Sequence, residues 1–145
     1  MKNKISKELK RYNYLFGETG AVYHEMYMKL GLSDSAMSVL YTVLENGGSC
    51  MLQDVCRFTG LAKQTINSAV RRLEADGVVY LETAGSKNKM IYLTREGQDL
   101  AEKTAGCVIE AENEIFASWS QKDVEKYLEL TERFMRDLRE KAENI

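Results

Sequence analysis

The spacing of hydrophobic residues near the N-terminus predicts two α-helices. Apolar residues recur at alternating steps of four and three from Ile5 to Leu30, the period of an α-helix of about 26 residues. Gly31 is expected to end this helix, and Ser33 to cap a second one that continues to the turn at 46–48. A small domain cannot cover so long a first helix, so part of its apolar surface is expected to need a partner.

The next stretch has the pattern of two helices joined by a tight turn. A short helix is predicted over 52–58, and the glycine-containing turn at 59–62 leads into a second helix over 63–76. Two runs of alternating residues follow, at 78–83 and 89–93, with a polar, glycine-containing stretch between them. This pattern predicts a β-hairpin with a polar tip.

Two further helices are predicted in the C-terminal third of the chain. Thr94 is placed to cap a helix over roughly 95–117. Ser120 and Asp123 form a capping box of the Ser-x-x-Asp type, which opens a last amphipathic helix. With only one hairpin among these helices, the predicted fold class is mainly α with a small β-hairpin wing.

The helix predicted over 63–76 has two faces of opposite character. The apolar residues expected to face the core are Ile66, Ala69, Val70 and Leu73. The residues expected to face outward nearly all carry hydrogen-bond donors: Lys63, Gln64, Thr65, Asn67, Ser68, Arg71 and Arg72. An ordinary solvated helix face could have this composition, and what favours a binding surface is the turn before the helix and the hairpin after it.

Charge is distributed unevenly along the 145 residues, although the formal net charge is only −2. Residues 1–62 carry a net charge of +1, residues 63–95 carry +3 and residues 96–145 carry −6. Charges act mainly within a screening length of about 8 Å, so a local excess matters more than the total. The basic middle segment is therefore compatible with a polyanionic partner.

Composition and the scarcity of reactive side chains exclude several classes of protein. With 44% hydrophobic and 29% charged residues and no apolar run near 20 residues, we expect one soluble, cytoplasmic domain with no membrane partner. Cys50, Cys56 and Cys107 form no C-x-x-C pair, and His24 is the single histidine, so neither a disulfide framework nor a metal site is expected. The sequence has neither a glycine-rich phosphate loop nor a catalytic constellation, which predicts no enzyme and no cofactor.

The order of the elements defines a winged helix-turn-helix: a short helix, a glycine turn, a helix with a polar face and a basic hairpin. Three stretches carry a more specific pattern. They are Asp54-Val55-Cys56-Arg57-Phe58-Thr59-Gly60-Leu61-Ala62-Lys63-Gln64-Thr65-Ile66, Arg72-Leu73-Glu74-Ala75-Asp76-Gly77-Val78-Val79 and Tyr92-Leu93-Thr94-Arg95-Glu96-Gly97. With flanking helices on both sides, the chain resembles the MarR family of bacterial transcriptional regulators over nearly its whole length.

The resemblance implies a single MarR-like domain over 1–145, in which 32–96 form the DNA-binding lobe and 1–31 and 97–145 a helical dimerisation region. It implies a homodimer that binds a pseudo-palindromic operator in double-stranded DNA, as a repressor released by a small-molecule effector. Gln64, Thr65 and Ser68 fall where family members contact bases. The resemblance also implies DNA contacts without a base-reading role for four other residues: Lys63, Asn67, Arg71 and Arg72, the last three nearer the phosphates.

The wing departs from the family pattern. Family members usually carry Asp-Arg-Arg at the tip, whereas this chain has Gly85-Ser86-Lys87, and Lys89 is the other cation near the tip. Lysine lacks the planar fork with which arginine occupies a narrow minor groove. We therefore expect Lys87 and Lys89 to contact phosphates, with weaker or less sequence-selective wing contacts than in the family.

Three interpretations stay open at this stage. The same polar helix face could meet a protein, which makes a protein-interaction module without DNA binding the alternative function. Cys56 lies where the two helices of the motif cross, and a packed small side chain is favoured over a redox sensor there. An aromatic cluster is the candidate effector pocket, although core packing is the favoured role for each of its members: Tyr12, Phe16, Tyr23, Tyr27, Met37 and Tyr41.

Overall fold

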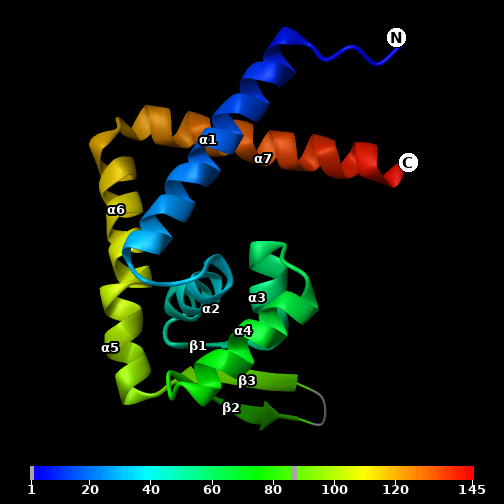
Figure 1. Cartoon of the computed structure of the whole chain (residues 1–145). Helices are drawn as coiled ribbons and strands as arrows, with labels where there is room; N and C mark the ends of the chain where they lie inside the picture. The colour runs from blue at the N-terminus through cyan, green and yellow to red at the C-terminus, as the bar shows by residue number, and fades with distance from the viewer. Residues whose placement is uncertain (1, 86–87) are drawn as a thin grey trace. The chain divides into compact units, whose positions relative to one another are not determined.

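A computed structural model describes residues 2–85 and 88–145 (Figure 1). It divides into two compact units, one up to Val108 and the other from Ile109 to Ile145. The described residues form these elements, in chain order: α1 (Lys7–Lys29), α2 (Asp34–Glu45), β1 (Ser49–Met51), α3 (Leu52–Thr59), α4 (Lys63–Ala75), β2 (Val79–Ala84), β3 (Asn88–Leu93), α5 (Arg95–Lys103), α6 (Ala105–Ser118) and α7 (Gln121–Glu143).

The predicted starts and ends of the first two helices are nearly all confirmed. Ser33 caps α2, since its hydroxyl accepts a hydrogen bond from the backbone of Ala36 at 3.2 Å. The first helix, however, begins at Lys7 and not at Ile5, because Ser6 accepts a hydrogen bond from the Leu9 backbone and so forms the N-cap.

The turn between α3 and α4 forms as the sequence predicts. Gly60 ends α3 with a φ of 70°, a left-handed conformation that a side chain would oppose. Thr59 holds the turn on both sides: its hydroxyl donates to the carbonyl of Val55 at 2.6 Å and accepts from the Leu61 backbone at 3.2 Å. These contacts fix where α4 begins.

The hairpin is confirmed, and the sheet contains a third strand that the sequence analysis missed. The strand order is β1-β3-β2 and all pairs are antiparallel, with Cys50 opposite Ile91 and Leu81 opposite the same residue from the other side. With three residues, β1 is too short to show an alternating pattern. Because β1 pairs with β3 and directly precedes α3, this strand connects the start of α3 to the wing.

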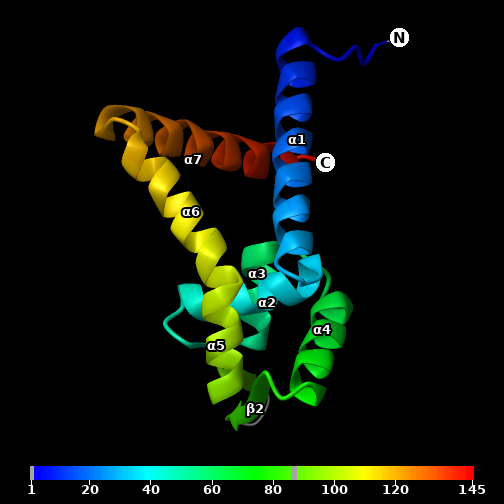
Figure 2. The ribbon, with the colours of Figure 1, turned by 60° about the vertical axis from the view of Figure 1, so that its left-hand side comes forward.

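The core of the first unit lies between α2, α4 and the sheet. Figure 2 shows α2 at the centre of this unit, with α4 on one side and α5 on the other. Fully buried side chains come from α2 (Met37, Leu40), α4 (Ile66) and β3 (Ile91). The buried face of α4 is therefore fixed by the core, and its other face is left outside.

The prediction of one helix over 95–117 is wrong, because the helix is interrupted at Thr104, between α5 and α6. Thr104 has a φ of −118° and a ψ of −84°, outside the helical region. Its hydroxyl donates to the carbonyl of Leu100 at 2.7 Å, and a threonine bonded back in this way bends a helix. At 4% exposure, Thr104 is held in this conformation by the core.

The second unit contains the rest of α6 and the whole of α7. Ser120 caps α7 as predicted, accepting a hydrogen bond from the Asp123 backbone at 3.1 Å. Phe116, Trp119 and Tyr127 form an aromatic cluster with ring centroids 5.5–6.2 Å apart, which packs the end of α6 against the start of α7. Among the residues described, no helix combines the length and apolar character needed to cross a membrane.

Candidate nucleic-acid interface

The two faces of α4 lie as the sequence predicts. Ile66, Val70 and Leu73 are at most 4% exposed and Ala69 is 8% exposed. On the other face Asn67 is half-buried, and the remaining residues are exposed: Lys63, Gln64, Thr65, Ser68, Arg71 and Arg72. The helix therefore presents a continuous row of amide, hydroxyl and cationic groups to the outside, held in place by its own buried side.

The first turn of α4 is electrostatically open to an anion. Ala62 occupies the N-cap position, where no side chain accepts a hydrogen bond, and the first turn contains no acidic residue. The N–H groups of a helix start and its dipole favour negative charge nearby. Lys63 adds a full positive charge at the same end.

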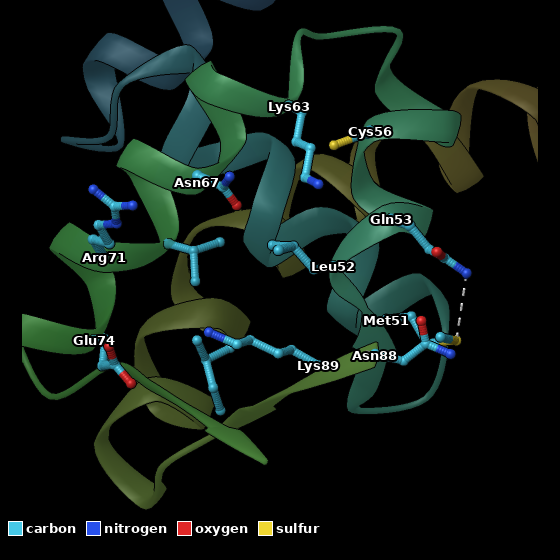
Figure 3. Close-up of a pocket in the computed structure, with 12 residues that line it drawn as sticks. Met51, Leu52, Gln53, Cys56, Lys63, Asn67, Arg71, Glu74, Asn88 and Lys89 are labelled. Atoms are coloured by element: carbon cyan, nitrogen blue, oxygen red, sulfur yellow. Dashed lines mark hydrogen bonds between the residues drawn. The ribbon is translucent and has the colours of Figure 1, made fainter. Parts of the chain in front are cut away.

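A cavity of about 490 Å³ is lined by residues of α3, α4 and the hairpin (Figure 3). Its apolar lining comes from Met51, Leu52, Val70 and Leu81, with the thiol of Cys56 beside them. Its polar lining comes from Gln53, Lys63, Asn67, Arg71, Asn88 and Lys89, with Glu74 as the acidic member. Figure 3 shows Lys63 and Lys89 on opposite sides of this space, while Arg71 extends toward its edge.

Two further hollows are lined by residues of α4. One, of about 400 Å³, is lined by Lys63, Gln64, Asn67, Ser68 and Arg71. The other, of about 760 Å³, lies between α4 and the start of α2, and Thr65, Ser68 and Arg72 face Ser33 and Ser35 across it. The exposed face of α4 therefore lies between hollows. This arrangement leaves the face free to enter the groove of a larger partner.

The wing residues are only partly described. Lys89 lies on β3 opposite Thr83, and its side chain is exposed. Lys87, the other predicted wing cation, lies outside the described residues. The structure therefore brings Lys89 to the same cavity as Lys63 and Arg71, and the role of Lys87 stays a prediction.

Sequence reasoning missed several polar residues around α4. Gln53 and Asn88 line the cavity with Lys63, and Ser33 and Ser35 line the hollow beside Arg72. Each is an ordinary surface residue in the sequence, and only the packing of α2, α3 and β3 around α4 brings them to it. Gln53 and Asn88 had no recognisable signal, whereas Ser33 was noted only as a helix cap.

The aromatic residues proposed as an effector pocket separate into two groups. Met37 is fully buried, and Tyr23, Tyr27 and Tyr41 are half-buried against the core. The other two are exposed: Tyr12 at 42% and Phe16 at 70%, with ring centroids 5.9 Å apart. None of the three cavities above is lined by these six residues, so the predicted pocket at this place stays a prediction.

The cysteines and the histidine differ in their surroundings. Cys50 is buried, Cys56 is half-buried against the core and Cys107 is exposed. Burial raises the pKa of the Cys50 thiol to about 11, and the charge of Asp54 adds to the effect. His24 is exposed, and its Nδ1 lies 2.9 Å from a carboxylate oxygen of Asp34 at the start of α2. Within the described part of the chain, no group of three acidic, cysteine or histidine side chains could hold a metal ion.

The fold and this surface together define a winged helix-turn-helix protein, and the comparisons agree. Residues 30–87 match the family model described as "MarR family". The MarR family regulator NMB1585 from Neisseria meningitidis has the same fold, with a TM-score of 0.85, 17% identity, and 97% of this chain and 100% of that chain covered. The likeness to NMB1585 shows that the chain has the fold of this MarR family regulator, and the family model matches the part of the chain between 30 and 87.

Two other similar structures were determined with a bound molecule. Sco3205, a MarR family regulator from Streptomyces coelicolor, was solved in complex with DNA; its TM-score is 0.70, at 16% identity with 94% of this chain and 91% of that chain covered. NadR, solved in complex with 4-hydroxyphenylacetate, also has a TM-score of 0.70 and 16% identity, covering 91% and 94%. No curated protein sequence matches the chain.

Proposed function

We propose that the chain is a sequence-specific DNA-binding regulator that binds a pseudo-palindromic operator as a homodimer. The observation that carries this proposal is the outward face of α4, where seven polar or cationic residues lie opposite a buried apolar stripe. A major groove about 12 Å wide admits one α-helix and presents hydrogen-bonding base edges to it. The DNA complex of Sco3205, which shares the fold, supports the same use of this surface.

The residues of α4 divide by their position on the helix. Gln64 and Ser68 lie one turn apart on the exposed face, and Thr65 stands beside them, so these three are proposed to meet base edges. Arg71 and Arg72 lie farther along the helix, where they are proposed to contact phosphates. Lys89 is proposed to supply a further phosphate contact from the wing. Lys63 and Asn67 line both the hollow that Lys89 lines and the hollow that Gln64 and Ser68 line.

The dimer is proposed from the apolar residues that α1 and α7 leave exposed. No residue of either helix is buried, although α1 carries Phe16 and Val22 and α7 carries Leu128 and Leu138. Exposing so much apolar surface is costly at about 25 cal/mol per Å². A second copy would cover it and place two α4 helices for the two halves of one operator.

Repression and its release by a small molecule complete the proposal. The complex of NadR with 4-hydroxyphenylacetate shows that one protein of this fold binds a small organic acid. A repressor acts by occupying DNA, so an effector that stabilises a conformation unable to bind the operator would release it. A cytoplasmic location follows from such a role.

The alternative function is a protein-interaction module that uses the same face of α4. The acidic C-terminal third, with a net charge of −6 over 96–145, is compatible with a role away from DNA. The two functions differ in how binding depends on salt concentration and on DNA sequence. Binding to one defined DNA sequence that weakens with rising salt, and is absent from scrambled DNA, would favour the regulator.

The test begins with DNA fragments of the source genome retained by the purified protein and identified by sequencing. A recurring pseudo-palindrome among them is expected. On that sequence, Gln64→Ala or Ser68→Ala should cost about 1–3 kcal/mol and relax base preference, while Arg72→Ala should weaken defined and scrambled DNA alike. Equal losses on both DNAs for the Gln64 and Ser68 variants would show that bases are read elsewhere.

A further inference from the structure

We propose that the start of α1 carries a second DNA-binding site, which holds the phosphate backbone of a duplex other than the operator. Five exposed cations form this site, called here the basic N-terminal cluster: Lys2, Lys4, Lys7, Lys10 and Arg11. The bridging of two duplexes by one particle rests on the proposed function, whereas binding of a duplex at the cluster does not depend on it.

Positive charge is concentrated at this end of the chain. Residues 2–11 carry five cations and one acidic residue, Glu8, which gives a net charge of +4, although the whole chain has a net charge of −2. Within the described residues, none of the ion pairs involves a member of the cluster. The chain itself therefore leaves most of this charge without a counter-charge.

The helix start adds to the attraction for an anion. Lys7 is the first residue of α1 and Lys10 lies within one turn of it, while Lys2 and Lys4 precede the helix. The N-terminal end of a helix carries a partial positive charge, which disfavours cations there unless an anion lies nearby. A phosphate at this end would be attracted both by the side chains and by the helix dipole.

The cluster lies far from the face of α4 that is proposed to bind the operator. Every residue from 2 to 22 is exposed, and Tyr23 is the first residue of α1 that packs against the core. Lys7 precedes Tyr23 by about 24 Å along the helix axis, at 1.5 Å per residue. Figures 1 and 2 show the start of α1 and the hairpin at opposite ends of the first unit. A duplex held by α4 and the wing therefore leaves the cluster free for a second duplex.

The apolar residues among these cations favour DNA over a lipid surface as the partner. A basic amphipathic helix binds a membrane by inserting its apolar face. Ile5 and Leu9 are exposed, but they belong to the apolar side of α1 that a second copy is proposed to cover. The cations then remain without an apolar face to insert. The phosphates of a duplex bind such a cluster by charge alone, without a requirement for base sequence.

Binding at the cluster should be weak and strongly dependent on salt. Non-specific DNA binding has a Kd on the order of 10⁻⁴–10⁻⁶ M at physiological salt. Each neutralised phosphate contributes about −0.9 to the slope of log affinity against log salt, so five contacts give a slope of up to about −4.5. An increase in salt from about 50 to about 200 mM should then weaken the binding by up to about 500-fold.

The test is the capture of a second duplex. An operator duplex is fixed to a surface and saturated with the protein, and a scrambled duplex with a fluorescent label is then added. The native protein should capture the scrambled duplex and release it as salt rises. Lys4→Ala combined with Lys7→Ala and Lys10→Ala should weaken capture at least about tenfold and make its salt slope less steep by up to about 2.7. Operator binding by this variant should be unchanged.

A second triple variant is the matched control. Lys122→Ala combined with Lys126→Ala and Lys141→Ala removes the same charge from exposed positions of α7, and it should preserve capture. Equal losses in both triple variants would reduce the effect to net charge and overturn the site. Capture that persists in the cluster variant would also overturn it, because the second duplex would then be held by an α4 helix.

Light scattering and circular dichroism establish that the cluster variant keeps the native assembly and fold. If it does not, Lys2→Ala with Lys4→Ala replaces it, since both positions precede α1. This double variant should make the salt slope of capture less steep by up to about 1.8. An unchanged slope would refute the cluster.

Failure of the proposed function gives a different result. If the protein retains no operator, the full chain is fixed to the surface and the scrambled duplex is added directly. Binding that is lost in the cluster variant would then support the second site while the operator proposal fails. If the operator binds and no second duplex is captured, the regulator stands and the cluster is not a DNA site. Binding of phosphatidylserine vesicles or polyglutamate at the cluster, without binding of the scrambled duplex, would also refute DNA as its partner.

Discussion

Gly97 lies where α5 passes the backbone at the end of α4, and this approach leaves no room for a side chain. A Cβ at Gly97 would overlap the carbonyl group of Val78. The hydroxyl of Thr94 closes the same junction, accepting from the Gly97 backbone at 2.9 Å and donating to the carbonyl of Gly77 at 2.6 Å. One glycine thus lets the end of α4, the start of β2 and α5 meet.

Gly97→Ala is expected to lower the free energy of unfolding by about 3 kcal/mol or more, because backbone atoms must move to admit the methyl group. Gly106→Ala is the matched control, since a Cβ there would lie 3.5 Å from the nearest atom, the carbonyl oxygen of Ala101. That variant should change stability by less than about 1 kcal/mol. Urea unfolding measures both, and equal effects would contradict the close approach.

The sequence reveals that Gly97 is part of a family pattern, and it does not reveal why. Its neighbour Val78 is 19 residues away along the chain, and the contact exists only once β2 and β3 have formed. Residues whose role depends on local chemistry were predicted well: Ser33 and Ser120 are caps, and Gly60 is the turn glycine. Roles that depend on tertiary packing were beyond sequence patterns.

Burial of Cys50 gives stability a dependence on alkaline pH. The pKa of its thiol is raised from 9.0 to about 11 by desolvation, with the charge of Asp54 acting in the same direction. The unfolded chain therefore loses this proton first as pH rises above 9. The stabilisation is complete below pH 9 and is lost between pH 9 and 11.

The measurement is a comparison of the native chain with Cys50→Ala across that range. The difference in unfolding free energy between the two should be constant from pH 7 to 8.5 and should change in favour of the variant as pH rises toward 11. All other ionisable side chains are the same in both proteins, so the difference isolates residue 50. A pH-independent difference would mean that the Cys50 thiol is no harder to ionise in the folded chain.

At the scale of elements, the sequence predicts the buried face of a helix, which follows from periodicity. It does not predict a helix break that depends on packing in the core. The stripe of Ile66, Ala69, Val70 and Leu73 repeats at helical spacing, and all four are buried. No proline marks the break at Thr104, and the nearby Gly106 lies within α6 and not at the break itself. Only the buried position of Thr104 and its bond to Leu100 turn an ordinary helical residue into the end of α5.

The wing is the element whose contribution to DNA binding can be separated most clearly. Lys87→Ala with Lys89→Ala should remove up to two phosphate contacts per subunit, and therefore up to four per dimer. The slope of log affinity against log salt is about −0.9 for each neutralised phosphate, so it should become less steep by up to roughly 3.6. The single change Lys89→Ala should account for up to half of this.

The control is the circular dichroism of the double variant, which should match that of the native chain. A wing that only covers the core would leave the salt slope unchanged in a folded variant, and recognition would then be confined to α4. Lys2→Ala with Lys4→Ala is a matched change of charge before the start of α1, and it should leave the slope unaltered.

At the scale of the whole molecule, the strongest feature is apolar surface that the chain does not cover itself. Phe16 is 70% exposed, Met28 66% and Leu138 58%. The spacing of apolar residues predicted this excess on the first helix. Which partner covers this surface depends on tertiary and quaternary packing, and so cannot be read from the periodicity of one helix.

We therefore expect the protein to be a dimer, with a mass by light scattering near twice 16.5 kDa at micromolar concentration. Leu128→Glu combined with Leu138→Glu should yield a monomer, because burying these carboxylates between two copies would require them to lose water without a partner. Neither leucine is buried within the chain, so the variant should keep its native circular dichroism. Arg136→Glu, outside the apolar stripe of α7, is the matched control and should remain dimeric. A stable monomer of the native chain would refute the dimer and, with it, the binding of two operator halves by one particle.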